Sequence, residues 1–472
     1  RSTLFPYTTL FRSGYYLQQR IYHGSNPRII FEHGVHIHNV AKITEAIAKS
    51  TGGILNPDTA YALGLIHDIG RIKDETVTGV PHGVEGYRYL NEVGFHLYPN
   101  AFKLTATETK AVSASQFERA YPNGFDEGSI TIGALTLNQK TCGFEIGGKD
   151  QNILCVNFPQ PLTDQSSCVI DFDFVSLIPN ANHRYGYGQN TINCGNFYPI
   201  LCVFEDGQWV KDGYSSNGDP FYSELANYDV TLNYPSSHTL VSTGEQNISK
   251  DQQTSVCHSV ALAVRDFAFV LSDKFSSLSQ TVGNTVLNYY YYDEEDPKSS
   301  LKTCVDALTT FNDMIGTYPY KVLNVCKSNF LQGGMEYPNL VLISDVVDVQ
   351  SEYKNVIVHE IGHQWFYGVV GNDECTHPWL DEALTEYVTA LFYDKNEGYD
   401  KTTQSVLSSA LSSYLLFCDM YSEVYGKLDT SMNRSIYDFK TEAESTYITY
   451  VKGVLMFDSV SEIVGKNKME KC

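Results

Sequence analysis

The segment Val356–Tyr387, VIVHEIGHQWFYGVVGNDECTHPWLDEALTEY, contains two histidines at helical spacing. His359 and His363 are four residues apart, so on a helix both imidazoles lie on one face and can reach one ion. Glu360 lies about 100° round the helix from His359, where it faces the open side of such an ion without binding it. Apolar residues flank the motif on both sides, which predicts a buried helix whose polar groups need partners.

A second helix is expected to bring a carboxylate to the same point. Pro378 is a helix-entry signal, and Glu382 follows His363 by nineteen residues, enough for one helix to end and another to begin. Glu386 is one turn further along the same face, placed for a hydrogen bond to a ligand imidazole. Two histidines and one carboxylate leave a tetrahedral Zn²⁺ with one open position, the pattern of catalytic rather than structural zinc. The alternative, a surface helix with incidental histidines, fits the apolar flanks poorly.

Composition bounds the class of protein. The 472 residues allow roughly two to four domains, and the net charge of −22 argues against a nucleic-acid partner. No apolar run reaches the length of a membrane-spanning helix. All eleven cysteines lie from Cys142 onward and none forms a Cys-x-x-Cys pair, which does not predict a disulfide framework. Unpaired cysteines favour a reducing interior, but a signal or anchor upstream of this sequence would change the compartment, which stays open.

The character of the sequence changes along the chain. Residues 1–13 show no helical or strand period and read like a translated sequencing adapter, so we expect them to be disordered and exclude them from the fold. Residues 95–275 read as strands of a β-sandwich-like domain, as in Ile170–Phe174, where apolar residues alternate with aspartates. Residues 276–472 begin with a strand and continue with helical patterns at about 298–316, 350–370, 380–395, 401–422 and 450–465.

Residues 14–94 predict a short all-α segment and resemble the HD family of metal-dependent phosphohydrolases. The matching text is HGVHIHNVAKITEAIAKS (His33–Ser50), LGLIHDIGR (Leu63–Arg71) and HGVEGYRYL (His82–Leu90). The resemblance implies a divalent-metal site that activates water against a phosphate ester. Its ligands would be His36 (or His33), His67 and Asp68, with His82 as a further contact. No later Asp in a helical context follows, so we expect a vestigial site in a partial domain.

Residues 95–472 resemble the gluzincin zinc aminopeptidases of the aminopeptidase N type. The resemblance rests on the Val356–Tyr387 segment, on GGMEYPNLVLIS (Gly333–Ser344) and on YVKG (Tyr450–Gly453), in the order that the family has them. It implies a β domain at 95–275 and a thermolysin-like α+β catalytic domain at 276–472. It also implies that this catalytic domain is incomplete at its C-terminus.

The resemblance assigns a role to each residue of the site. His359, His363 and Glu382 would hold one zinc ion, and Glu360 would be the general base. Tyr450 would stabilise the oxyanion. Glu336 would bind the free α-ammonium group of a peptide substrate, with the backbone of Gly333 and Gly334 lining the substrate.

Some positions depart from the family pattern. Tyr337 stands where the family usually has Asn, and Asn196 is the best candidate for the β-domain residue that joins Glu336 at the amine. The join near Gly94 has no linker composition, which suggests an artificial fusion. The alternatives to an aminopeptidase are an HD-type phosphohydrolase and a non-catalytic peptide-binding relative; the complete set of zinc ligands and base argues against the latter.

Overall fold

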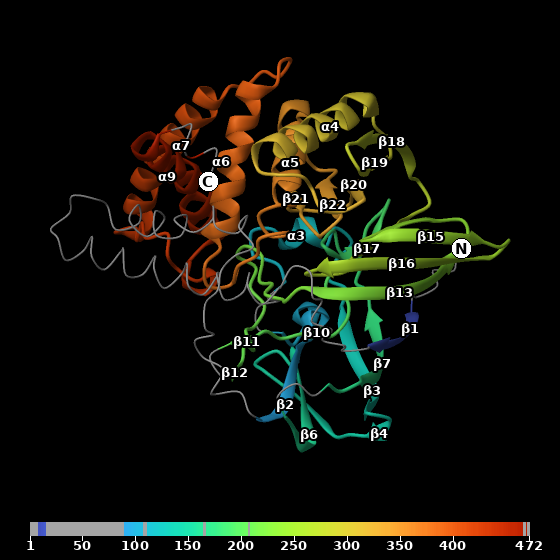
Figure 1. The fold of residues 1–472 in the computed structure, drawn as a ribbon. Coiled ribbons are helices and arrows are strands. Elements are labelled where there is room, and N and C mark those ends of the chain that lie inside the picture. The colour runs from blue at the N-terminus through green and yellow to red at the C-terminus, as the bar shows by residue number, and fades with distance from the viewer. Residues whose placement is uncertain are drawn as a thin grey trace, which may run out of the picture.

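The computed structural model describes residues 8–15, 89–106, 111–163, 167–205, 208–465 and 469. Figure 1 shows a strand-rich region that holds β2 to β17 and, packed against it, a region with helices α4 to α9. The mixed α+β, multidomain architecture expected from the sequence is therefore confirmed.

Antiparallel sheets build the strand-rich region, because its segments alternate between buried and exposed side chains. In β7, Ile170, Phe172 and Phe174 are buried while Asp173 is exposed. Four sheets have the orders β1-β7-β3-β4, β10-β2-β6-β5, β13-β16-β15 and β14-β17-β9-β8, and β11-β12 forms a short hairpin. The elements are β1 (Thr8–Tyr15), β2 (Tyr89–His96), η3 (Tyr98–Phe102), α3 (Phe117–Ala120), β3 (Ser129–Leu137), β4 (Lys140–Thr141), β5 (Phe144–Gly147), β6 (Ile153–Thr163), β7 (Ile170–Leu177), β8 (Tyr185–Tyr187), β9 (Ile192–Cys194), β10 (Ile200–Leu201), β11 (Phe204–Glu205), β12 (Gln208–Trp209), β13 (Ala226–Pro235), β14 (Thr239–Ser242), β15 (Glu245–Lys250), β16 (Thr254–Val264) and β17 (Phe269–Ser272).

A five-stranded sheet with the order β18-β19-β20-β22-β21 begins the second region. Its inner strands β19, β20 and β22 are parallel, and β21 pairs antiparallel with β22 at the edge. Its elements are β18 (Ser276–Val282), β19 (Thr285–Tyr291), α4 (Pro297–Met314), β20 (Val322–Ser328), β21 (Gly334–Met335), β22 (Leu340–Ser344) and α5 (Gln350–Gly362). The helices that follow are α6 (Trp379–Lys395), α7 (Thr403–Tyr425), η4 (Ile436–Asp438), α8 (Glu442–Thr446), the π-helical turn η5 (Tyr447–Val451) and α9 (Lys452–Val464).

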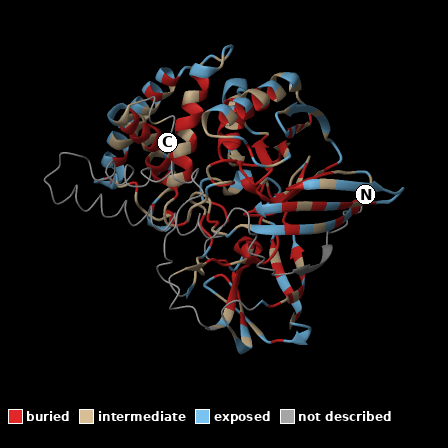
Figure 2. Ribbon diagram, viewed as in Figure 1, coloured by how far each residue is buried: buried red, intermediate tan, exposed pale blue. Residues whose placement is uncertain are grey.

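Buried residues run through both regions (Figure 2), and they form apolar clusters, one of which spans the two regions. One cluster fills the strand-rich region and continues into Phe330–Leu342, so the segment that contains β21 lies at the junction. A second joins the five-stranded sheet to α4 and α5, and a third joins α6, α7 and α9. The segment Val356–Tyr387 contributes to the second and third clusters, for example through Ile357 and Trp379.

Three expectations need correction. Residues 1–13 are not wholly disordered, because β1 pairs with β7 over eight residues through backbone hydrogen bonds, which do not depend on side-chain pattern. The boundary at 94/95 falls inside β2, which pairs with β6 on both sides of Gly94, so the strand-rich region begins at or before Tyr89. The helix expected at 350–370 ends at Gly362, because the chain turns back there and Gly368 N donates to His363 O.

Two further features concern the cysteines and the helices. The cysteines that the structure describes are all free. Across the described residues, no helix combines the length and apolar character needed to cross a membrane.

Candidate metal centre

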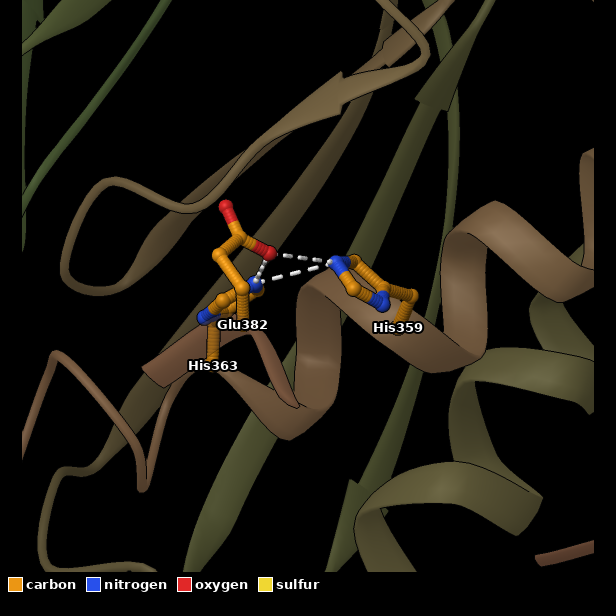
Figure 3. A group of neighbouring side chains, drawn as sticks. All are labelled: His359, His363 and Glu382. Atoms are coloured by element: carbon orange, nitrogen blue, oxygen red, sulfur yellow. Dashed lines mark hydrogen bonds and ion pairs between the residues drawn. The ribbon is translucent and has the colours of Figure 1, made fainter. Parts of the chain in front are cut away.

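Helices α5 and α6 bring together the three residues that the sequence predicted as zinc ligands (Figure 3). His359 lies in the last turn of α5, His363 caps that helix, and Glu382 lies in the first turn of α6. The Nε2 atoms of the two histidines are 3.0 Å apart, and Glu382 Oε2 lies 3.1 Å from that of His363 and 3.3 Å from that of His359. All three residues are buried, at most 8% exposed.

The hydrogen bonds of the two imidazoles suit this triangle to a cation. His363 Nδ1 donates to the carbonyl of Phe366 at 3.0 Å, and His359 Nδ1 lies 3.1 Å from Glu386 Oε1. With the protons on Nδ1, both Nε2 lone pairs and a carboxylate oxygen of Glu382 point at one another. Three acceptors at this distance repel unless a proton or a metal ion lies among them, and in the absence of a metal Glu382 raises the pKa of His363 to about 10 against the effect of burial. Ligand atoms of a tetrahedral zinc, at roughly 2.0–2.1 Å from the ion, are about 3.3 Å apart, so the donor set fits Zn²⁺.

Two further predicted residues contact these ligands. Glu386 faces His359, as described, from one turn along α6. Tyr450 donates from its hydroxyl to Glu382 Oε1 at 2.5 Å, and its ring lies against that of His359. Tyr450 is in the π-helical turn η5, a distortion that often occurs at functional sites because it re-aims a side chain. The sequence motif predicted the residue but not this geometry.

Glu360 is buried beside the edge strand β21. Its Oε1 lies so close to the backbone of Gly334 that a Cβ there would be 2.3 Å away. Its Oε2 has no hydrogen-bond partner among the described residues. Burial raises the pKa of Glu360 to about 7, against the opposing effect of His359 and His363. A carboxyl group that titrates near neutrality suits a proton acceptor.

Glu336 follows β21 directly and is 3% exposed, with Oε1 unpartnered among the residues that the structure describes. Burial, together with Asp219, raises the pKa of Glu336 well above its usual range. Gly334 pairs with Ile343 on one side only, so the other edge of β21 is free of a described strand. A side chain at Gly333 would meet no clash, because the nearest atom to its Cβ would be 3.6 Å away, in Val356.

Asp219 was not found from the sequence. Its carboxylate lies in one group with those of Glu336 and Glu382, their oxygens within 4.8 Å of one another, and it pairs with the guanidinium of Arg184. Its only sequence signal is the turn Asn217-Gly218-Asp219-Pro220, which predicts a loop and nothing more. The suggested Asn196 is engaged elsewhere, because its amide bonds to Tyr337 and Asp266 rather than to Glu336.

Buried acidic groups surround the centre. Burial and the neighbouring Glu382 raise the pKa of Asp381 to about 8, and burial and Asp381 raise that of Glu374 well above its usual range. Both carboxyl groups have oxygens without a partner in the described part of the chain. A cation placed beside these carboxyl groups would favour their ionised form.

The predicted HD ligands His36, His67, Asp68 and His82, with His33, lie outside the described residues. Their arrangement therefore stays a prediction.

Two protein-family models match parts of this chain. Residues 299–472 match the model of the peptidase family M1 domain, and residues 34–136 match that of the HD domain. The second match runs past the expected boundary at 94, into residues that fold as β2, η3, α3 and β3.

Among similar curated proteins, leucine aminopeptidase 2-1 of Meyerozyma guilliermondii is 26% identical over 155 residues, which cover 31% of this chain and 24% of that protein. Aminopeptidase M1-B of Oryza sativa subsp. japonica is 31% identical over 135 residues, 24% of this chain and 15% of that protein. The aligned parts thus span about a quarter or less of these relatives.

The fold has a solved counterpart. The M1 zinc metallopeptidase of Deinococcus radiodurans superposes with a TM-score of 0.53 at 13% sequence identity, over 82% of this chain and 78% of that one. At this identity the likeness concerns the fold alone. The candidate metal centre therefore lies in a segment that matches the peptidase family M1 domain, within a chain whose fold over most of its length resembles that of an M1 zinc metallopeptidase.

Proposed function

We propose that this chain is a zinc-dependent aminopeptidase that removes N-terminal residues from peptides. The observation that carries the proposal is the triangle of His359, His363 and Glu382 with Glu360 and Glu336 buried beside it. The match to the M1 domain and the aminopeptidase relatives support it. A thermolysin-like catalytic domain and a sandwich-like β domain at about 95–275 belong to the same proposal.

Zinc, when bound by these three residues, would polarise the scissile carbonyl and lower the pKa of water. Glu360 accepts the proton of the attacking water and delivers it to the leaving amine, a role that its pKa of about 7 allows near neutral pH. Tyr450 offers a hydroxyl to the developing oxyanion once its bond to Glu382 is released. Glu386 holds the His359 ring in the tautomer that keeps Nε2 free.

Exopeptidase action follows from Glu336 and Asp219. Their carboxyl groups lie within 4.8 Å of that of Glu382, and a cation beside them favours their ionised form, so we expect them to pair with the α-ammonium group at the end of a peptide. The open edge of β21, at Gly333 and Gly334, is expected to pair with the extended substrate backbone.

The test compares free and N-acetylated peptides of one sequence, cleaved by the zinc-loaded full chain. Cleavage of free N-termini alone, lost in Glu360→Gln, is expected. Glu352→Gln, the same change on the exposed part of α5, is the matched control and should cleave at the normal rate. Equal cleavage of acetylated peptides would refute the exopeptidase assignment, and a fully active Glu360→Gln would refute the assigned base.

The HD match supports a second candidate, a metal-dependent phosphohydrolase activity of the upstream segment. His36, His67 and Asp68 would hold its divalent metal. The activity should appear on phosphate esters with added Mn²⁺ and disappear in His67→Ala with peptidase activity intact. If Mn²⁺ supports no hydrolysis, the vestigial interpretation is favoured.

A further inference from the structure

Glu336 lies in surroundings that repel it. Asp219, Glu360 and Glu382 all act to raise its pKa, and its Oε1 has no partner among the described residues. His363 acts the other way and attracts the carboxylate. The residues on either side of Glu336 also determine where it lies.

Both neighbours of Glu336 are held by the strand-rich region. Arg184 donates to Met335 Sδ at 3.1 Å. Tyr337, fully buried, donates from its hydroxyl to Asn196 Oδ1 at 2.9 Å. The Tyr337 hydroxyl occupies the space of a side chain at Gly195, where a Cβ would be 1.8 Å away, so only glycine at 195 permits the contact.

Asn196 is in turn held in place by its own backbone conformation and by a hydrogen bond to Asp266. It has a left-handed backbone with φ of 52°, and its Nδ2 donates to Asp266 Oδ2 at 2.7 Å. Asp266 Oδ1 accepts from the Tyr198 hydroxyl at 2.7 Å and from the backbone of Phe267 at 2.6 Å. Every member of this chain of bonds is at most 3% exposed, so solvent does not compete with it.

The backbone around Glu336 is held from the other side, by the turn that follows α5. Gln364 Nε2 donates to the carbonyls of Glu336 and Tyr337 at 3.3 and 3.2 Å. Glu336 is thus placed by two regions at once, its backbone by α5 and the following turn, and its neighbouring side chains by the strands.

We propose that Tyr337, through Asn196 and Asp266, is a positioning residue that holds Glu336 for the α-ammonium group of the substrate. The inference rests on the proposed function and adds residues to it. It also accounts for a tyrosine at 337: a shorter side chain at that position would not reach Asn196 across the junction.

Two zinc-binding ligands that differ by one amine test the proposal. Leucine hydroxamate carries the α-ammonium group and 4-methylpentanohydroxamate lacks it, so the ratio of their dissociation constants isolates the amine contact. Titration calorimetry on the zinc-loaded full chain measures both without turnover. We expect wild type to favour the amine by roughly ten- to a hundredfold, the range of a charge-assisted bond in a buried site.

Tyr337→Phe keeps the ring and removes only the hydroxyl. We expect it to reduce the ratio roughly three- to tenfold while affinity for 4-methylpentanohydroxamate is unchanged. Asn196→Gly, which suits the left-handed backbone, should act in the same direction. Tyr393→Phe is the matched control, because it removes an equivalent bond from a buried tyrosine to Asn355 and should leave the ratio as in wild type.

A double-mutant cycle separates positioning from general stability. In a Glu336→Gln background the effect of Tyr337→Phe on the ratio should vanish, because the group that it positions is gone. A wild-type ratio in both Tyr337→Phe and Asn196→Gly would overturn the proposal. Persistence of the effect without Glu336 would do so as well. If the wild-type protein itself binds both hydroxamates equally well, the amine role of Glu336 is refuted, and this proposal with it.

Discussion

Asp266 is expected to make the folded protein less stable as pH rises through neutrality. Burial raises its pKa from 3.8 to about 7, although the bonds from Tyr198, Phe267 and Asn196 act the other way. A carboxyl group whose folded pKa is raised binds its proton more tightly when folded. Its contribution is therefore complete below the unfolded pKa of 3.8 and is lost as pH rises through about 7.

The size of the effect follows from these two pKa values. Inserting both pKa values in the linkage relation gives the contribution of Asp266 to the free energy of unfolding. It is about 2.7 kcal/mol at pH 5 and less than about 0.1 kcal/mol at pH 8. The side chain is 2% exposed, so solvent screening does not reduce the figure much.

The assay is urea unfolding of wild type and Asp266→Asn at pH 5 and pH 8, at saturating zinc. The variant is expected to be less stable at both pH values, because an amide cannot accept all three bonds. Between pH 5 and 8, however, wild type should lose about 2.6 kcal/mol more than the variant does. Asp229→Asn, which alters an exposed carboxylate, controls for the change of net charge. Parallel pH profiles for wild type and Asp266→Asn would refute the reasoning.

Three other changes have expected outcomes. Glu386→Gln should weaken zinc binding roughly 10- to 100-fold, measured by chelator competition, because His359 loses the carboxylate that orients it; unchanged affinity would exclude that role. Tyr450→Phe should lower kcat roughly 100- to 1000-fold with little change in KM, as expected for a donor to the oxyanion, whereas a change confined to KM would contradict it. His96, whose pKa burial lowers from 6.5 to about 4, contributes stability that is complete above pH 6.5 and is lost as pH falls through 4. The loss should reach about 3 kcal/mol at pH 4 and be absent in His96→Phe, which keeps the stacking on Tyr98; an equal acid loss in the variant would show that other groups cause it.

Much of the metal centre was predictable because it is local. The spacing of His359, Glu360 and His363 depends only on helix geometry, and Glu382 lies at the start of the next helix. The helices at 298–316, 380–395 and 401–422 were likewise expected within a few residues of α4, α6 and α7. Apolar periodicity and helix-entry signals suffice for such elements.

Other features depend on contacts between distant segments. Asp219 has no motif, yet it meets Glu336 and Glu382 because the strand-rich region packs against the zinc helices. The contacts of Asn196 with Tyr337 and Asp266 span 141 and 70 residues, and no local pattern encodes them. The pairing of β1 with β7, and of β2 across Gly94, arose from backbone groups that any sequence offers.

The sequence by itself thus determined which residues can hold a metal and move a proton, because those depend on residue type and helical period. The tertiary structure decided how the carboxyl group of Glu336 is placed and how each buried acid titrates, because burial and long-range packing set both.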